Sequence, residues 1–224
     1  MAYSSAQRKR VKTIGLKNKK RPSELDGWIS DGEVQSKFLD YWKMRNLGLK
    51  KFVEMADPWY SELVKVFSCN LKINEGTLYS KVKWVDIKLT EEVWVDIAGL
   101  KMEGEKCHLG IDGFHKFSIY QECLRNPNDI QYYSHYKTGG MKKDDKLVVF
   151  IISWILLPRG GNHAQATTED LLLLKALKDN IQVDWPAAIS ENMLKVTRLE
   201  STKLPYCVFI SKILVHFGIN CIDE

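Results

Sequence analysis

The most apolar window in the chain covers residues 147–157, where Ser153 is the only polar side chain. This run is too short to span a membrane, which takes about 20 residues, and it fits either a helix buried on all sides or a buried strand. Its β-branched side chains favour a strand. Its length, the acids Asp144 and Asp145 at its start and the abrupt stop before Pro158 favour a helix. On balance we expect a helix that forms the centre of the hydrophobic core.

A sharp corner follows this helix, and two successive glycines give it the freedom to turn. Arg159 is expected beside the carbonyls of the helix C-terminus, where a cation is favoured. Together with Asn162 and His163 it is expected to hydrogen-bond backbone groups that the helix ends leave unpaired. The alternative is a functional site, but a catalytic His163 would need a nucleophile or a paired carboxylate, and no nearby residue fits that role convincingly.

The helix after the corner has clear signals at both ends. Thr167 or Thr168 can cap its start, and acidic residues occupy the first turn. The leucines of 171–177 supply its apolar face, and Asn180 is a suitable terminator.

The remaining hydrophobic pattern predicts short elements joined by polar loops. Alternation over 77–89 predicts a small β-hairpin or a pair of short strands. Helical spacing, caps and breakers predict helices at 31–55, from Asp57-Pro58 to about Asn70 (with Trp59, Leu63, Val66 and Phe67 inward), 90–99, 112–124, 184–199 and 204–217. The stretch 101–113 is expected to be a loop, and 126–143 a long internal loop or a partner-facing segment. The predicted fold is a single, mainly α domain over 26–224 with a small β-hairpin.

The positive charge of the chain is concentrated at one end. Residues 1–23 hold eight basic side chains and no acid, so the remaining 25 basic residues face 28 acidic ones and the net +5 belongs to this segment. We expect a disordered basic arm over 1–25. Its two basic clusters resemble a bipartite signal for a nuclear-import receptor and can bind nucleic acid nonspecifically; the alternative is a solvated tail without a receptor. The residues concerned are Arg8, Lys9, Arg10, Lys12, Lys17, Lys19, Lys20 and Arg21.

Reactive groups are scattered rather than grouped. The five cysteines form no CxxC pair and follow no apolar leader, which predicts free thiols in a reducing compartment. Cys107, His108, His115 and Cys123 lack the paired spacing of a zinc site. Neither a phosphate-binding loop nor a dinucleotide fingerprint is present. We therefore expect no metal, no cofactor, no membrane segment and no enzyme.

Four stretches carry a resemblance to a known family. They are LPRGGNHAQATTEDLLLLKALKDNIQVDWP at 157–186, PWYSELVKVFSCNLKI at 58–73, VKWVDIKLTEEVWVDIAGL at 82–100 and LPYCVFISKILVHFGI at 204–219. Over roughly residues 30–220 the chain resembles the plant transposon protein domain, found in retroelement-derived reading frames of legumes. A strand pair followed by a short helix ending in Gly-Leu is also similar to the plant mobile domain. The resemblance implies transposon origin and a nuclear context, and it brings no catalytic set.

Two hypotheses about function follow. The first is a non-enzymatic, transposon-derived interaction module, nuclear or otherwise cytoplasmic, with weak nucleic-acid contact through the arm. The second is a gag-like structural protein that self-associates.

Overall fold

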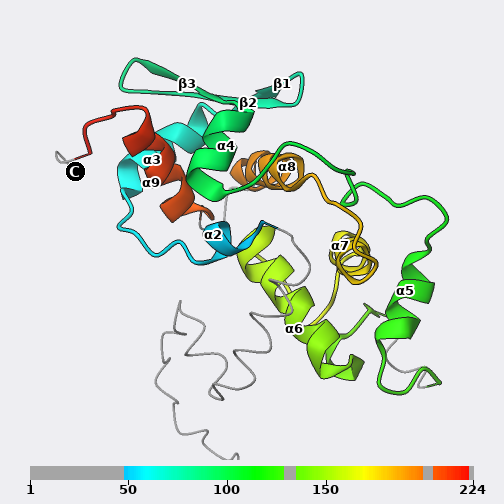
Figure 1. Ribbon diagram of the computed structural model, residues 1–224. Helices are drawn as coiled ribbons and strands as arrows, with labels where there is room; N and C mark the ends of the chain where they lie inside the picture. The colour runs from blue at the N-terminus through cyan, green and yellow to red at the C-terminus, as the bar shows by residue number, and fades with distance from the viewer. Residues whose placement is uncertain (1–47, 129–134, 199–203, 222–224) are drawn as a thin grey trace, which may run out of the picture. The chain divides into compact units, whose positions relative to one another are not determined.

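The computed structural model describes residues 48–128, 135–198 and 204–221, which all lie in one compact unit, Trp42–Glu224 (Figure 1). The expected arm and most of the helix expected at 31–55 lie outside the described residues. The elements, in chain order, are α2 (Lys50–Val53), α3 (Ser61–Cys69), β1 (Lys72–Asn74), β2 (Thr77–Val82), β3 (Val85–Leu89), α4 (Glu91–Ala98), α5 (Lys116–Cys123), the 3-10 turn η3 (Thr138–Gly140), α6 (Lys143–Ile151), the π-helix η4 (Ile152–Leu156), α7 (Thr168–Lys178), α8 (Trp185–Thr197) and α9 (Cys207–His216). The described part of the chain is thus mainly helical with a small sheet, as predicted.

The sheet is antiparallel, with its strands in the order β1-β2-β3. The predicted hairpin is confirmed as β2 and β3, whose register pairs Leu78 with Leu89 and Val82 with Val85. β1 was not predicted, because three residues are too few to display alternation. Both connections are two-residue turns with positive φ at each position, Glu75-Gly76 and Lys83-Trp84, which is the geometry that matches strand twist in tight hairpins.

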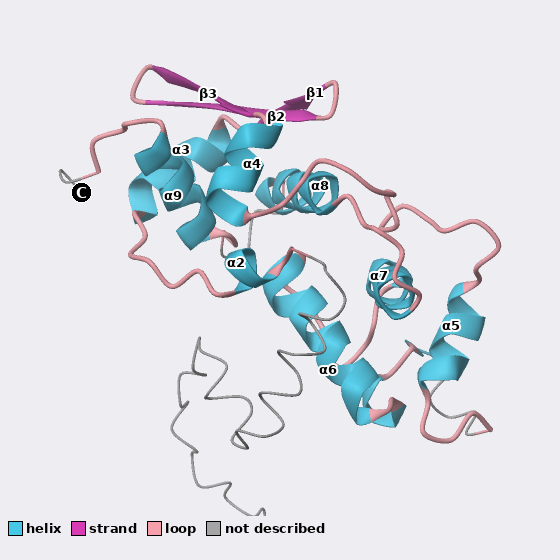
Figure 2. Ribbon diagram, in the orientation of Figure 1, coloured by secondary structure: helices cyan, strands magenta, loops and turns pink. Residues whose placement is uncertain are grey.

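One group of helices packs on a single face of this sheet (Figure 2). Helices α3, α4 and α8 contact β2, β3 and β1 respectively, and α9 packs against α3 and α4. The aromatic centre of this group is Phe209, which stacks on Trp94 with 4.9 Å between ring centroids and meets the edge of Phe52 at 5.4 Å. Inward side chains of the strands, such as Leu78 and Ile87, complete this part of the core.

The segment expected at the centre of the core is helical, as predicted. Asp144 and Asp145 occupy the first turn of α6, and the helix continues as η4 until Leu156, just before Pro158. Its buried side chains pack against α7, whose Leu171, Leu173 and Leu174 are fully buried. The expectation that the helix is buried on all sides is wrong: Trp154 is 39% exposed. This segment also fills only one part of the core, since Phe209 and its neighbours form another.

The capping residues predicted from the sequence are found at the ends of α4, α7 and α8. Gly99 closes α4 in the left-handed region. Thr167 and Asp170 form a reciprocal capping box at the start of α7, and Asn180 follows its end with φ +57°. The Asp184 side chain accepts a hydrogen bond from the Ala187 amide at 3.0 Å, with Pro186 in the first turn of α8.

Three predicted helix starts are wrong by a few residues. α3 begins at Ser61 rather than at Asp57, because the Asp57 carboxylate pairs with Lys212 at 2.8 Å instead of capping. Trp59 and Val66 consequently face solvent, and Leu63, Val64 and Phe67 form the buried stripe. α5 begins at Lys116 instead of 112, and α9 begins at Cys207 instead of 204. Within the described ranges, no helix is long and apolar enough to cross a membrane.

Candidate functional site

The corner after η4 is built by Arg159. Its guanidinium donates to the Asp170 carboxylate at 2.5 Å and to the Gln165 carbonyl at 2.9 Å. The expectation that Arg159 lies beside the C-terminal carbonyls of the preceding helix is therefore replaced by a contact with the N-terminal end of α7. The buried Asp170 side chain offers a stronger partner than exposed carbonyl groups, because a charge-assisted bond is favoured in a poorly solvated site.

The Asp170 carboxylate joins the corner to the next helix. Besides Arg159 it accepts the Thr167 amide at 2.7 Å, while the Thr167 hydroxyl accepts the Asp170 amide at 3.1 Å. Asp170 is only about 1% exposed, so its charge depends on these partners. The corner is thus a structural ion pair fused to a capping box.

Asn162 and His163 lie in the same corner and take different roles. The Asn162 side-chain oxygen accepts the Ala164 amide at 3.0 Å, as expected for a turn residue. The His163 ring stacks on Trp154 with 3.9 Å between ring centroids, and Trp154 stacks in turn on Phe150. The π-helical turn presents Trp154 to this stack: the Leu157 amide bonds the Ile152 carbonyl five residues back.

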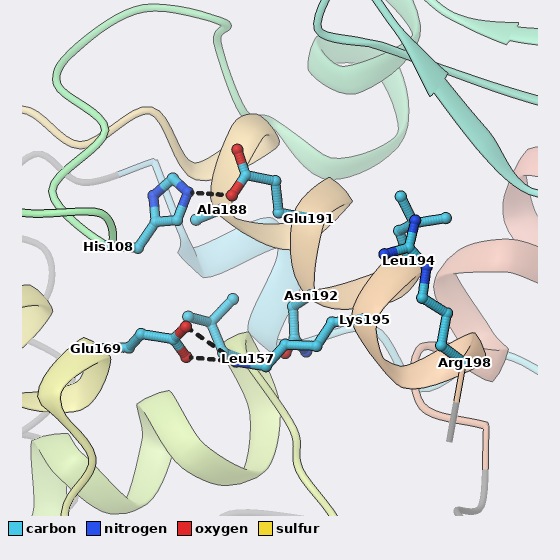
Figure 3. A pocket seen from close by; sticks show the side chains of 9 residues that line it. All are labelled: His108, Leu157, Glu169, Ala188, Glu191, Asn192, Leu194, Lys195 and Arg198. Carbon is cyan, nitrogen blue, oxygen red and sulfur yellow. Dashed lines mark hydrogen bonds and ion pairs between the residues drawn. The ribbon is translucent and has the colours of Figure 1, made fainter. Parts of the chain in front are cut away.

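A pocket of about 330 Å³ opens beside this corner (Figure 3). One face of α8 forms a wall, and the loop holding His108, the first turn of α7 and the end of η4 form the rest. Its lining residues are His108, Leu157, Glu169, Ala188, Glu191, Asn192, Leu194, Lys195 and Arg198. The volume lies at the lower end of the range for small-molecule sites.

Polar side chains pair across this pocket. The His108 Nε2 atom lies 3.0 Å from a Glu191 carboxylate oxygen, and the Lys195 ammonium lies 2.9 Å from Glu169 (Figure 3). His108 is buried, and its Nδ1 atom has no hydrogen-bond partner within the described structure. Arg198, at the far end of the α8 face, forms no ion pair with the described residues. Most of the polar side chains that line the pocket are therefore paired with one another, and Leu157, Ala188 and Leu194 add apolar surface.

The back of the pocket is fixed by a polar network. The Asn192 amide donates to the Pro158 carbonyl at 3.1 Å and to the Tyr206 hydroxyl at 2.7 Å. That hydroxyl donates to the Leu156 carbonyl at 2.8 Å. Burial raises the pKa of Tyr206 well above its usual range, so the hydroxyl stays protonated and acts as a donor. This network ties α8 and the start of α9 to the end of η4.

The four cysteine and histidine side chains of 107–123 do not come together as a cluster. Among the described residues no three His, Cys, Asp or Glu side chains gather where they could hold a metal ion. Burial raises the pKa of the Cys107 and Cys207 thiols, and it raises that of Cys123 to about 12, with the nearby Asp145 carboxylate adding to the shift. These thiols are therefore protonated at neutral pH, and the thiolate is the reactive form.

Cys123 belongs to a cluster with the buried Asp145 and the half-buried Lys178. The Lys178 ammonium lies 3.0 Å from the Asp145 carboxylate and 3.9 Å from the Cys123 sulfur. Burial alone would lower the pKa of Lys178, but the hydrogen bond to Asp145 and the neighbouring negative groups raise it on balance. The cluster joins α5, α6 and α7.

From this cluster we expect the protein to lose stability in alkali. Folding raises the pKa of both Cys123 and Lys178. Their contribution to the free energy of unfolding is therefore complete below about pH 9 and is lost as the pH rises toward 12. The Cys123 share amounts to about 2 kcal/mol of unfolding free energy between about pH 8 and pH 10.5, at about 1.4 kcal/mol per pH unit. Urea denaturation of wild type and Cys123→Ala at both pH values measures it. Cys69→Ala, at an exposed thiol, is the matched control and should keep the wild-type pH dependence. Equal losses in all three proteins would contradict the assignment.

The eight basic residues predicted to contact nucleic acid or an import receptor lie outside the described residues. Of the predicted site residues within the described ranges, the structure brings Arg159, Asn162 and His163 together at the corner after η4. Sequence reasoning missed the pocket, whose walls come from four separate segments. The capping signals did place Glu169 at the start of α7, but no local signal brings it to Lys195.

No protein-family model, curated protein or solved structure matches this chain. The resemblance of residues 30–220 to the plant transposon protein domain therefore stays a prediction.

Proposed function

We propose that this chain is a non-enzymatic, transposon-derived interaction module that acts in the nucleus, with its basic arm contacting nucleic acid weakly and without sequence preference. The observation that carries this proposal is the separation of charge: eight basic side chains in residues 1–23 precede a body with a slight excess of acid. Such a segment binds polyanions and import receptors, and its charge contrasts with the slight net negative charge of the body.

The corner around Arg159 supports an interaction role over catalysis. Its cation and its carboxylate are committed to each other and to backbone groups. His163 stacks on an aromatic ring rather than beside a nucleophile. These groups stabilise the fold, and transposon origin, taken from the resemblance in sequence, accounts for a helical module without a catalytic set.

Deleting residues 1–23 is expected to abolish nuclear accumulation of the chain fused to two fluorescent proteins, a size that slows passive entry. The reason is loss of all eight clustered cations. Fluorescence microscopy of plant cells gives the nuclear-to-cytoplasmic ratio. The full chain with the eight residues replaced by Gln controls for length and should behave like the deletion. A ratio equal to wild type in both variants would refute the import role.

A second candidate is self-assembly of a gag-like structural protein, favoured by large apolar side chains in solvent such as Trp59, Leu109 and Val215. Size-exclusion chromatography with light scattering separates the two. An oligomer that grows with protein concentration supports assembly, and a monomer throughout supports the module.

A further inference from the structure

One row of side chains crosses all three strands on the face of the sheet that the helices leave open. The register pairs Lys72 with Tyr79 and Tyr79 with Lys88. Neighbouring residues on each strand point the other way: Leu78 on β2 and Ile87 on β3 are buried, and Ile73 on β1 is half-buried. The packed helices lie on that buried side (Figure 2). We define the row Lys72, Tyr79 and Lys88 as the open face of the sheet.

The charges on this face favour an anionic partner. Lys72 and Lys88 are exposed and form no ion pair with any described residue, and the Lys88 ammonium lies 5.7 Å from the centroid of the Tyr79 ring. The acid on the same face, Asp86, is matched by Lys81 at 3.2 Å. Glu75 lies outside the strands, in the turn that joins β1 and β2. Two unmatched cations therefore flank one aromatic ring.

The turn between β2 and β3 adds a second aromatic surface. Trp84 is 93% exposed and has φ +68°, a conformation that side chains other than glycine rarely adopt. Tight turns of this kind prefer Asn-Gly, so a tryptophan here costs stability, and such strain concentrates at binding positions. Trp84 is four residues from Lys88, the partner of Tyr79, and so lies roughly 14 Å from that pair along the sheet, at about 3.4 Å per residue.

We propose that the open face of the sheet, extended by Trp84, binds single-stranded nucleic acid. Lys72 and Lys88 contact phosphates, and the Tyr79 and Trp84 rings stack on unpaired bases. An open sheet face with aromatic rings between cations suits single strands, because an unpaired base offers its whole ring to stacking while the lysines follow the backbone. A duplex hides its bases from such a face. The site is additional to the basic arm and does not depend on it.

The test separates this site from the arm by using the full chain with Arg8, Lys9, Arg10, Lys12, Lys17, Lys19, Lys20 and Arg21 replaced by Gln. Fluorescence anisotropy measures its affinity for a labelled oligothymidylate of about 15 nucleotides and for an abasic strand of the same length. Tyr79→Thr, which keeps strand propensity, is expected to weaken oligothymidylate binding about tenfold and leave abasic binding unchanged. Trp59→Thr, at an exposed aromatic residue outside the sheet, is the matched control and should change neither.

The lysines are tested by salt dependence in the same background. Replacing Lys72 and Lys88 with Gln is expected to weaken binding of both strands and to reduce the slope of log K against log salt by about 1.4, since each single-strand phosphate contact contributes about 0.7. Replacing Lys106 and Lys146, two exposed lysines on other segments, removes the same charge and should leave the slope unchanged.

The outcomes distinguish the two proposals. Base-dependent binding that survives neutralisation of the arm and falls with Tyr79→Thr supports the sheet site, whatever the arm does. Loss of all binding on neutralising the arm overturns the sheet site and supports the arm alone. The sheet site is also overturned if Tyr79→Thr binds oligothymidylate as tightly as wild type, or if it loses equal affinity for the abasic strand. Tighter binding to a labelled duplex of the same length, measured in the same way, would overturn it as well.

Discussion

Ile152→Asp is expected to unfold the domain at room temperature. Ile152 is fully buried where α6 passes into η4, so a lone carboxylate there would lose its hydration without gaining a partner. An uncompensated buried charge costs at least about 4 kcal/mol, a large part of the 5–15 kcal/mol that stabilises a typical domain. Far-ultraviolet circular dichroism with thermal melting measures the loss.

The matched control for this substitution is Lys146→Asp, at an exposed position of the same helix. It is expected to change the unfolding free energy by less than about 0.5 kcal/mol, because a surface charge stays hydrated. A cooperative melt of Ile152→Asp close to that of wild type would mean that the 147–157 segment does not form part of the core.

Asp170→Ala is expected to cost about 3–5 kcal/mol of unfolding free energy. The substitution leaves the partly buried guanidinium of Arg159 without its anion and the Thr167 amide without its acceptor, and it removes half of the capping box of α7. Breaking a buried pair from one side costs more than the pair contributes, because the other charge stays behind unpaired. Urea denaturation of the full chain gives the value.

Two further variants test whether the pair or the position is responsible. Glu169→Ala changes the neighbouring acid, whose ion pair with Lys195 is solvent-exposed, and should cost less than about 1 kcal/mol. The double variant Arg159→Met with Asp170→Ala should recover part of the loss by removing both charges. Equal costs for Asp170→Ala and Glu169→Ala would rule out the buried pair as a major source of stability.

Features with a local physical cause could be predicted from the sequence. Thr167, Asp184 and Gly99 act within one turn of the helix they cap, so their signals need no knowledge of the rest of the fold. The hairpin over 77–89 can be predicted for a similar reason, because the alternation of apolar and polar residues indicates strands with one buried face.

Features that depend on residues far away in the sequence could not be predicted in this way. The sequence around Asp57 predicts a helix cap, but in the structure the Asp57 carboxylate forms an ion pair with Lys212, a residue far along the chain. A uniformly apolar run such as 147–157 has no periodicity to indicate that Trp154 faces outward. The pocket and the open face of the sheet depend on tertiary packing and on the register of β1, a strand too short to predict.

The strained turn at Trp84 has a consequence for engineering this domain. Selection of variants for heat resistance alone would favour glycine at this position, since a left-handed backbone costs other residues about 1–2 kcal/mol. Such a selection would remove the most exposed tryptophan side chain of the described residues while raising the thermal stability of the domain. Optimised versions of the domain should therefore retain this tryptophan until its role in recognition has been assayed.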